Sequence, residues 1–535
     1  DFILTYNGEI YNYLEIKKEL TELGVAFKTK SDTEVLIKSY QMFGEKCVDK
    51  FEGMWSFAIY DKRENKLFLS RDRFAEKPLF YYESSDGFYF GSEIKFIKEL
   101  SGNSLSINNN HIYRYLVNGH KSLHKTSDTF YNGIKEVEFA TNLSISNNRI
   151  IQYKYWKPSY SPIKITEKDA LEGINYFLKK SLKLRLRSDV PLAFCLSGGV
   201  DSASLVSLAA KEFNYDVSTF SIIDSDKRYN ELENIQSTVN DIGCKSFKVK
   251  LDSNNDNITR LENLVKYHDA PVATISYFVH SILSEAIASK GFKISVSGTG
   301  ADEIFSGYYD HFNLHLNEIK GDKDFNKYLL DWKTFTHKYV RHPDLRKHDL
   351  YFKNSNLRSH IYLNNNYFSD FLKTPFKEEF TEKKYTPSLL RNRMMNEMFH
   401  EVVRVILHED DLNSMFYSIE NRSPFLDKDL FEFVNTIPSK YLIKNGYAKN
   451  LLRTSMNGVL NNKVRLDREK KGFNASINSI INFNNKEHLE YILDDSKIFE
   501  FVKKDKIESL LKSKEYSNSF KKFLFNFINT KIFIS

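Results

Sequence analysis

Short apolar runs separated by turn residues fill the first part of the chain. They lie at residues 2–6, 57–60, 66–70 and 78–82. Runs of this kind between turn residues are typical of strands. Residues 11–23 and 31–43 instead repeat apolar side chains at helical spacing, and the second segment opens on a capping-box pattern, Ser31-x-x-Glu34. The pattern predicts a layered domain over residues 1–155, either α+β or with an all-β core.

The pattern changes after residue 168, where long helical periods alternate with short apolar strands. The predicted strands are residues 191–196, 217–223, 246–250 and 293–297. This alternation predicts a parallel, doubly wound sheet, which binds ligands beyond the carboxyl ends of its strands. The chain from about residue 310 to 535 is mostly helical in pattern. Residues 156–168 contain two prolines and indicate a linker, which leaves a second domain at 169–535.

Composition excludes several classes of protein. A chain of 535 residues with 41% hydrophobic and 27% charged residues is typical of a globular protein with two or more domains. The net charge of +7 is scattered rather than striped, so we expect neither nucleic acid nor a membrane as partner. No apolar run approaches the ~18 residues of a membrane span. The three cysteines, Cys47, Cys195 and Cys244, show no disulfide or zinc spacing, which favours a cytoplasmic location.

The most informative motif is Leu-Ser-Gly-Gly-Val-Asp-Ser at residues 196–202. An apolar strand leads into it and a helix-like stretch follows, so its glycines let a ligand approach free N–H groups at a helix start. Ser197 and Ser202 add hydroxyl groups, and Asp201 can hold magnesium against phosphate oxygens. The motif lacks the Gly-Lys-Ser/Thr of the common P-loop. It resembles the pyrophosphate-binding loop of ATP pyrophosphatases, and the alternative is a Ser/Gly-rich turn without a ligand.

A second glycine turn occurs within Val-Ser-Gly-Thr-Gly-Ala-Asp-Glu at residues 296–303. It also follows a predicted strand and places a carboxylate, Asp302, at a helix start. Such carboxylates can be mere helix caps. Because Asp201 and Asp302 recur at the ends of two strands of one sheet, we favour a nucleotide site with magnesium.

With these motifs in view, the chain resembles the glutamine-dependent asparagine synthetase family over nearly all of its length. The N-terminal motifs of the resemblance are residues 6–12, 31–34, 51–55 and 71–79. The C-terminal motifs are residues 197–202, 297–303, 418–427, 449–453 and 468–473. The resemblance implies an N-terminal-nucleophile glutaminase sandwich, incomplete at its start, followed by an α/β synthetase domain with a helical C-terminal region.

The family also implies roles for individual positions. Asn7 and Gly8 match the oxyanion-hole donors of glutamine hydrolysis, and Glu9 and Asp32 match carboxylates that hold the ammonium group of glutamine. The positions that match the ATP site are Leu196, Ser197, Gly198, Gly199, Asp201, Ser202, Ile222, Ser297, Gly298 and Gly300. Asp201 and Asp302 match the magnesium–pyrophosphate positions.

Two further positions match the synthetase chemistry. Glu420 belongs to the signature that faces the synthetase site, and Lys449 matches a lysine that neutralises the phosphates and the adenylate. The alternatives are a structural salt-bridge network of Glu420, Arg422 and Asp427, and a surface position for Lys449.

The chain departs from the family at four places. The N-terminal cysteine nucleophile and the arginine for the glutamine carboxylate are absent, and we expect both upstream of Asp1 in the native protein. Thr299 stands where family members often place a carboxylate, and Ala75 stands where glycine is usual. The spacing between residues 303 and 418 suits the longer branch of the family. Thr299 puts the acceptor substrate in doubt more than the ATP chemistry.

The resemblance therefore predicts a ligase that adenylates the aspartate side chain with ATP and forms the amide with ammonia from glutamine. Three alternatives stay open: another carboxylate acceptor such as a uronic acid of a surface polysaccharide, a β-lactam-forming relative, or a catalytically silent family member. Many relatives are homodimers, and the sequence leaves the oligomeric state open.

Overall fold

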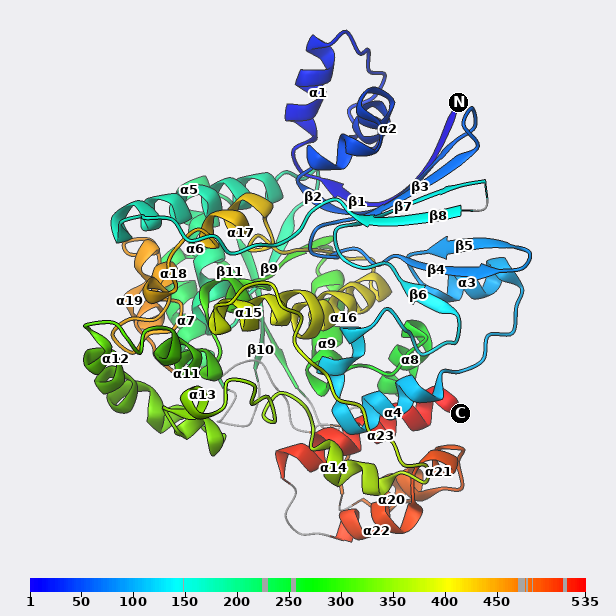
Figure 1. Cartoon of the computed structure of the whole chain (residues 1–535), viewed down its shortest axis with the longest axis vertical. Coiled ribbons are helices and arrows are strands. Elements are labelled where there is room, and N and C mark those ends of the chain that lie inside the picture. The colour runs from blue at the N-terminus through cyan, green and yellow to red at the C-terminus, as the bar shows by residue number, and fades with distance from the viewer. Residues whose placement is uncertain are drawn as a thin grey trace.

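The computed structural model describes residues 1–147, 149–223, 230–251, 256–469, 477, 480–483, 485–512 and 517–535. Residues 470–473 of the motif at 468–473 lie outside this part of the chain. Two antiparallel sheets occupy the N-terminal part, and a parallel sheet surrounded by helices occupies the rest (Figure 1). This is the mixed α/β arrangement that the hydrophobic pattern predicts.

The larger antiparallel sheet has five strands in the order β1-β2-β3-β7-β8. These strands are β1 (Phe2–Ile10), β2 (Gly53–Asp61), β3 (Lys66–Arg71), β7 (Thr141–Ser146) and β8 (Arg149–Lys154). The smaller sheet runs in the order β5-β4-β6, with β4 at Phe80–Ser84, β5 at Gly87–Gly91 and β6 at Ile134–Glu136. Helices α1 (Tyr13–Glu22) and α2 (Asp32–Phe43) pack against one face of the larger sheet (Figure 1), where Leu36 of α2 shares a buried apolar cluster with Phe57 of β2 and Phe68 of β3. The predicted strands and both predicted helices are confirmed.

The capping-box prediction is wrong in its second half. Ser31 Oγ accepts a hydrogen bond from the Thr33 N–H at 3.0 Å and so caps α2. The Glu34 carboxylate instead accepts from the N–H groups of Lys28 and Thr29, at 2.9 and 2.6 Å. The helix therefore uses Glu34 to hold the preceding loop rather than its own first residue.

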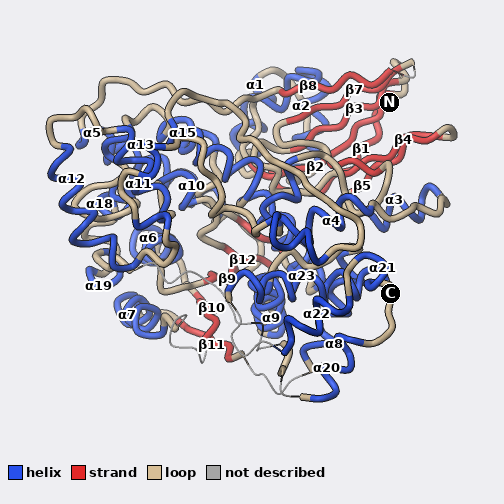
Figure 2. The backbone as a smooth tube through the Cα atoms, turned by 60° about the horizontal axis from the view of Figure 1, so that its bottom comes forward, coloured by secondary structure: helices blue, strands red, loops and turns tan. Residues whose placement is uncertain are grey.

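The parallel sheet has the strand order β11-β10-β9-β12-β13, and all neighbouring strands are parallel. Figure 2 labels β11, β10, β9 and β12 of this sheet. Its strands are β9 (Leu192–Cys195), β10 (Ser218–Ile223), β11 (Lys245–Lys250), β12 (Ile294–Val296) and β13 (Glu420–Arg422). The chain order reverses between β9 and β12, which makes their carboxyl ends the topological switch point where such sheets bind ligands. The four predicted strands are confirmed, whereas β13 was not predicted.

Helices cover both faces of the parallel sheet and make up most of the C-terminal part (Figure 2). The helices up to the second turn are α3 (Ile94–Ser101), α4 (Asn109–Asn118), α5 (Glu167–Arg185), α6 (Val200–Phe213), α7 (Leu232–Ile242), α8 (Asn257–His268), α9 (Ile275–Ser289) and α10 (Ala301–Phe305). Those that follow are α11 (Tyr309–Glu318), α12 (Phe325–Asp331), α13 (Leu350–Lys353), α14 (Asn365–Phe368), α15 (Leu389–Asn396), α16 (Val403–Phe416), α17 (Lys428–Val434) and α18 (Asn450–Ser455). The last are α19 (Asn462–Arg465), α20 (Lys486–Leu493), α21 (Ile498–Phe501), α22 (Lys504–Lys512) and α23 (Asn518–Ile534).

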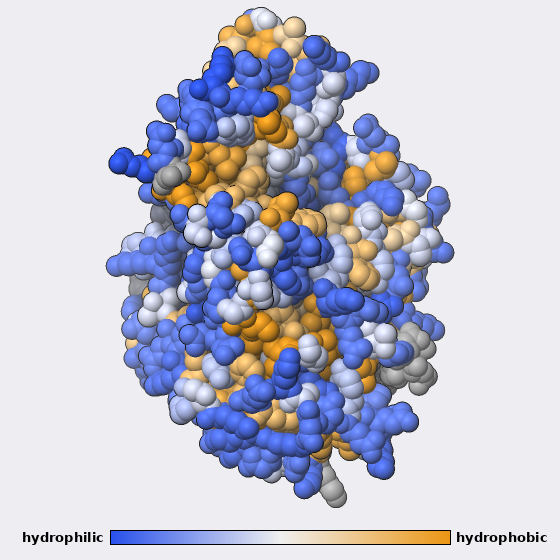
Figure 3. Space-filling model, turned by 90° about the vertical axis from the view of Figure 1, so that its right-hand side faces the viewer, coloured by the Kyte–Doolittle hydropathy of each residue, from blue (hydrophilic) through white to orange (hydrophobic). Residues whose placement is uncertain are grey.

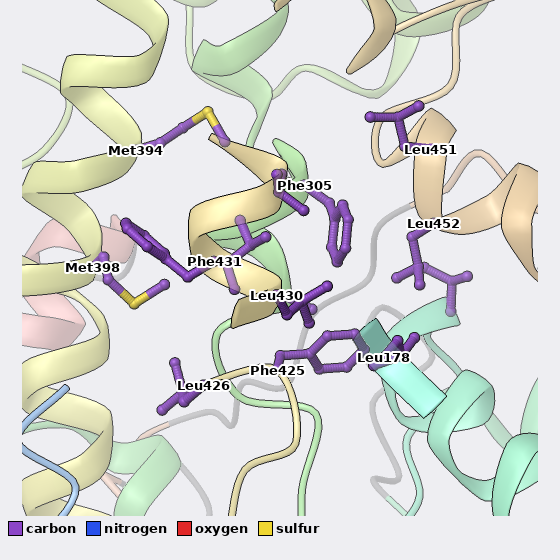
Figure 4. Close-up of a cluster of buried hydrophobic side chains, with 14 of the residues drawn as sticks. Leu178, Phe305, Met394, Met398, Phe425, Leu426, Leu430, Phe431, Leu451 and Leu452 are labelled. Atoms are coloured by element: carbon purple, nitrogen blue, oxygen red, sulfur yellow. The ribbon is translucent and has the colours of Figure 1, made fainter. Parts of the chain in front are cut away.

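A buried apolar cluster fixes the second glycine turn against the C-terminal helices (Figure 4). Phe305 of α10, Phe425 and Leu426 have at most 1% of their surface exposed. Met394 and Met398 approach them from α15 and the turn that follows it, while Leu430 and Phe431 come from α17 and Leu451 and Leu452 from α18. Burial of such side chains stabilises a fold by about 2 kcal/mol each. The core therefore holds α10, and the loop before it, in a defined position.

Ion pairs join the N-terminal part to the parallel-sheet part. Arg185 at the end of α5 has a fully buried side chain, 3.0 Å from Glu52 and 3.2 Å from Asp427. Lys77 lies 2.9 Å from Asp411 of α16, and both of these side chains are also buried. Glu52 and Asp427 belong to sequence motifs, whereas nothing in the pattern marks Arg185 as their partner.

The face of the molecule in Figure 3 carries several apolar areas interrupted by hydrophilic side chains. Exposed apolar side chains occur on the elements that lie on that side in Figure 1, with Ile151 of β8 59% exposed and Leu100 of α3 66% exposed. Among the described residues, no helix has both the length and the apolarity needed to cross a membrane.

Candidate active sites

The first candidate site lies at the end of β1, where Asn7, Gly8 and Glu9 follow one another. Gly8 has φ of +147° and pairs with Trp55 of β2. A Cβ atom at Gly8 would lie 2.1 Å from the Met54 carbonyl oxygen, so only glycine fits this close approach of two strands. The Asn7 side-chain amide donates to Ser92 Oγ at 3.0 Å, which fixes its orientation.

Asp32, the first residue of α2, reaches back to the same strand. Its Oδ2 atom accepts hydrogen bonds from the Tyr6 hydroxyl at 2.8 Å and from the Ile10 N–H at 3.1 Å. The structure therefore brings together four residues that the sequence assigned to glutamine: Asn7, Gly8, Glu9 and Asp32. Tyr6 was not among the predicted site residues, although it belongs to the motif at residues 6–12.

The environment of Glu9 links the two halves of the molecule. Burial, followed by the charge of Glu420 on β13, raises the pKa of Glu9 to about 7, against opposing effects of Arg422 and Lys77. Glu420 itself forms an ion pair with Arg422 at 2.7 Å, and 23% of its side chain remains exposed. Glu9 of the first site is therefore close enough to Glu420 of the parallel sheet for the charge of Glu420 to shift its pKa.

The signature at residues 418–427 serves the structure as well as the site. Arg422 Nη1 donates to the carbonyl oxygens of Arg185 and Arg187 at 2.9 and 2.6 Å. Asp427 caps α17 by accepting from the Leu430 N–H at 3.0 Å and pairs with Arg185. The structural reading therefore holds for Arg422 and Asp427. Glu420 also joins this network through its ion pair with Arg422, while 23% of its side chain remains exposed at the edge of the sheet.

The second candidate site is built on the loop between β9 and α6. The Ser202 hydroxyl accepts from the Ser197 N–H at 3.0 Å and lies 3.0 Å from Ser197 Oγ, so the loop closes on itself. Gly199 has extended backbone and forms the N-cap of α6. The Gly198 N–H donates to the Glu231 carboxylate at 3.1 Å. The sequence analysis did not predict Glu231 as a site residue. The only feature of the sequence that could have indicated it is its place after β10, the strand beside β9.

The turn after β12 lies directly against this loop. A Cβ atom at Gly298 would lie 3.0 Å from the Ser202 nitrogen and 3.1 Å from Asp201 Cβ. Gly300 has φ of +93°, and a Cβ atom there would lie 2.5 Å from Leu426 Cδ2. The hydroxyls of Ser297 and Thr299 lie 3.0 Å apart. Glycines at 298 and 300 are thus required by close approach and by backbone conformation, respectively.

Lys449 joins the two loops. Its ammonium group lies 2.5 Å from Asp201 and 2.7 Å from Asp302, and only 7% of its side chain is exposed. Burial lowers the pKa of Lys449, but the two carboxylates outweigh burial and raise it above its ordinary value. The surface reading of Lys449 is therefore wrong. A Cβ atom at Gly307 would lie 2.4 Å from the lysine Cε atom, so a glycine makes room for the lysine stem.

The remaining predicted positions flank this site. Leu196 is buried, and its N–H donates to the Phe220 carbonyl of β10 at 2.9 Å. Ile222 lies on β10, near the carboxyl end of the strand beside β9. Glu303 of α10 is buried, and burial followed by the Asp302 charge raises its pKa to about 7. The donor set of Asp201 and Asp302 suits a hard divalent cation, which prefers carboxylate oxygens.

Two departures from the family pattern have structural consequences. Ala75 is buried and has φ of +58°, the left-handed region in which a side chain costs about 1–2 kcal/mol. This conformation explains why glycine suits the position. Cys47 is also buried, and burial raises the pKa of its thiol well above the ordinary value, so it does not present a thiolate.

One further cluster has the composition of a metal site. Asp310, His311 and Glu397 place ligand atoms within 4.8 Å of one another. Arg393 lies 3.1 Å from Glu397 and 3.6 Å from Asp310, and His311 pairs with Glu397 at 2.7 Å. The guanidinium group already neutralises these carboxylates, so we interpret the cluster as a buried ion-pair network.

Comparison with known proteins agrees with this division into two sites. Residues 173–528 match the asparagine synthase family, and residues 1–156 match the glutamine amidotransferase domain. The chain is 30% identical to asparagine synthetase (glutamine-hydrolyzing) 1 of Bacillus subtilis, over 95% of this chain and 81% of that protein. It is 36% identical to putative asparagine synthetase (glutamine-hydrolyzing) 2 of Methanocaldococcus jannaschii, over 58% of this chain and 60% of that protein. Asparagine synthetase (glutamine-hydrolyzing) 3 of Bacillus subtilis is 28% identical, over 86% of this chain and 73% of that protein.

Proposed function

Because the chain belongs to the asparagine synthase family, we propose that it is a glutamine-dependent asparagine synthetase. Membership makes it a carbon–nitrogen ligase that uses ATP, with glutamine as the amido donor. The observation that carries the proposal is Lys449, held between Asp201 and Asp302 at the switch point of the parallel sheet. The cation can bind phosphate oxygens beside the glycine loop, and the two carboxylates can bind the magnesium that accompanies a triphosphate.

In the synthetase reaction, an oxygen of the aspartate side chain attacks the α-phosphorus of ATP. The bond to pyrophosphate breaks, and an acyl-adenylate forms. Ammonia then attacks the acyl carbon, AMP leaves, and the nitrogen loses a proton. Glu420 supplies a partly exposed carboxylate that can accept this proton.

We assign the ATP site to the two loops and their flanks. The start of α6 faces the phosphates, and Ser197, Gly198, Gly199, Ser202, Ser297, Gly298 and Gly300 shape the two loops around them. Leu196 and Ile222 flank the nucleotide. Asp201 and Asp302 hold Mg²⁺, which shields the charge of the pyrophosphate. Lys449 neutralises phosphate charge as it develops on the leaving group.

We assign glutamine binding to the end of β1. Asn7 and Gly8 donate to the oxyanion of the hydrolysis intermediate, and Glu9 and Asp32 hold the glutamine ammonium group. These roles imply an N-terminal-nucleophile domain over residues 1–155, a linker at 156–168 and a synthetase domain at 169–535. The proposed linker packs against the C-terminal part, since the Trp156 indole N–H donates to Glu432 at 2.8 Å and Tyr160 reaches Ser439.

Thr299 favours a second candidate function within the family. Its hydroxyl and that of Ser297 form a neutral pair where a carboxylate is often found. A neutral side chain at position 299 suits an acceptor other than aspartate, such as a uronic acid, because a carboxylate there would orient the aspartate amino group.

The test measures AMP and pyrophosphate from ATP, Mg²⁺ and ammonium chloride, with and without aspartate. Because ammonium chloride supplies the ammonia, the measured release of products does not depend on glutamine hydrolysis. We expect aspartate-dependent release of both products together with asparagine. If AMP and pyrophosphate are released with a sugar acid but not with aspartate, the sugar acid is the acceptor. If no acceptor leads to their release, the protein is catalytically silent.

A further inference from the structure

A cavity of about 140 Å³ lies away from both candidate sites. One wall consists of the 3₁₀ turn η2 (His120–Lys125), the residues that follow it, and the end of β6. Further lining comes from Lys383, the end of α15, the π-helical turn η7 (Glu397–Glu401) and the start of α16. None of the residues assigned above to glutamine, ATP or Mg²⁺ lines this cavity.

Basic side chains outnumber carboxylates around the cavity. Lys125, Lys383 and Arg404 line it together with Glu136 and Glu138. Glu136 pairs with Arg71 outside the lining at 2.7 Å and also with Arg404 of the lining at 2.5 Å, whereas Glu138 pairs with Lys154 outside the lining at 3.0 Å. The walls therefore present an excess of positive charge to whatever enters.

Lys383 differs from the other two cations in its ion pairing. Among the described residues, no carboxylate lies within 4.0 Å of its ammonium group, whereas Lys125 pairs with Glu401 at 2.5 Å and Arg404 pairs with Glu136 at 2.5 Å. The backbone of Lys383 is nevertheless fixed, although the residue is exposed. The buried Asn396 side chain accepts from the Lys383 N–H and donates to the Lys383 carbonyl, both at 2.8 Å.

Burial and the same positive charges lower the pKa values of His400 and Lys154. Burial, and then the charges of Lys383, Lys125 and Arg404, lower the pKa of His400 to about 3. Burial is also the main cause that lowers the pKa of Lys154 to about 8, and Arg404 and Lys383 add to it. His400 is thus neutral at pH 7 and lines the cavity as a polar ring, with its Nε2 atom 2.7 Å from the Tyr385 hydroxyl.

The backbone of the cavity is irregular where it carries the lining. Phe399 and His400 stand on the π-helical turn η7, between α15 and α16. A π-helical turn costs helix stability and is frequent at functional sites. The irregular turn and a lysine without a carboxylate partner among the described residues are two separate features of one cavity.

We propose that this cavity is a binding site for a compact dianion, held by Lys383, Lys125 and Arg404. The ligand class is a phosphate-sized oxyanion or a short dicarboxylate, since both offer closely spaced charged oxygens to cations. The site is separate from the ATP loops and lies between the β6 side of the molecule and the start of α16. It therefore adds an anion site beyond the ligase reaction.

Calorimetric titration tests the proposal, with inorganic phosphate and malonate as the two probes. Saturating ATP and Mg²⁺ fill the nucleotide loops, no acceptor or ammonia is added, and sodium chloride keeps the ionic strength constant. The variant is Lys383→Met, and the matched control is Lys384→Met, an exposed neighbour outside the lining. We expect binding to the unmodified protein, at least about tenfold weaker binding to Lys383→Met, and unchanged binding to Lys384→Met.

Binding of phosphate alone, or of malonate alone, supports the proposal and identifies the ligand class. The absence of binding by either probe overturns it. An equal loss in Lys383→Met and Lys384→Met also overturns it, because general surface charge would then account for the affinity.

Discussion

Lys449 Nζ lies 2.5 Å from an oxygen of Asp201, although 248 positions separate the two residues in the chain. The contact places the start of α18 against the start of α6, and the same ammonium group reaches Asp302 in the first turn of α10. Two carboxylates that would otherwise repel each other are held together by one buried cation. The phosphate-facing edge of the sheet therefore depends on this lysine.

Replacement of Lys449 by methionine removes this cation and leaves the two carboxylates facing incoming phosphates. We expect ammonium-dependent pyrophosphate release to fall by a factor of at least about 100, since one electrostatic contact to developing charge is worth that much. Lys440→Met, at an exposed lysine nearby in the sequence, serves as control and should retain the rate within about twofold. A rate for Lys449→Met equal to that of the control would remove Lys449 from the site.

Replacement of Gly300 by alanine tests the conformation of the second turn. The left-handed backbone and the Cβ position 2.5 Å from Leu426 both oppose a side chain. We expect a loss of about 2–4 kcal/mol of unfolding free energy in urea denaturation. Gly321→Ala is the matched control, because a Cβ there meets nothing within 4 Å, and it should stay within about 0.5 kcal/mol of the unmodified protein. Equal stability of both variants would contradict this geometry.

The pair Arg185→Met and Arg187→Met compares a buried with an exposed ion pair across the same interface. Arg185 is fully buried between Glu52 and Asp427, whereas Arg187 and its partner Glu15 keep 27% and 55% of their side chains exposed. We expect Arg185→Met to cost about 3–5 kcal/mol, because it leaves buried carboxylates unpaired. Arg187→Met should cost about 1 kcal/mol or less. Thermal unfolding of the two variants provides the comparison, and a reversed order would refute the buried triad.

Glu9 makes stability depend on pH in a defined direction. Its pKa is raised from the ordinary 4.5 to about 7, so the folded protein holds a proton that the unfolded chain has already lost. Stability should therefore fall as pH rises from about 4.5 to 7, and the cost is complete above pH 7. Glu9→Gln removes the charge. We expect this variant to be about 1–3 kcal/mol more stable than the unmodified protein at pH 8, with the difference vanishing near pH 4.5.

Thermal unfolding at pH 5 and pH 8 measures this effect. Glu22→Gln, at an exposed glutamate of α1, is the control and should change stability equally at both values. A stability gain for Glu9→Gln that does not depend on pH would assign the effect to packing rather than to charge.

The sequence by itself determined the features that depend on neighbouring residues. The alternation of apolar runs and turns predicted four strands and two helices of the N-terminal part and four strands of the parallel sheet, and the loop at 196–202 was predicted as strand, glycine turn and helix. These features follow from backbone preferences and hydrophobic periodicity over a few residues, which are local properties. The family motifs likewise marked most residues that the structure brings together at the two sites.

Only the tertiary structure decided the relationships between distant segments. Residues 420–422 form a strand because the open edge of β12 supplies hydrogen-bonding partners, not because their sequence is strand-like. Arg185 pairs with Glu52 and Asp427, and Glu231 meets Gly198, through contacts that no local pattern encodes. The cationic cavity beside Lys383 also assembles from separate segments. Such contacts depend on how packed layers align side chains across hundreds of residues, and local preference carries no information about that alignment.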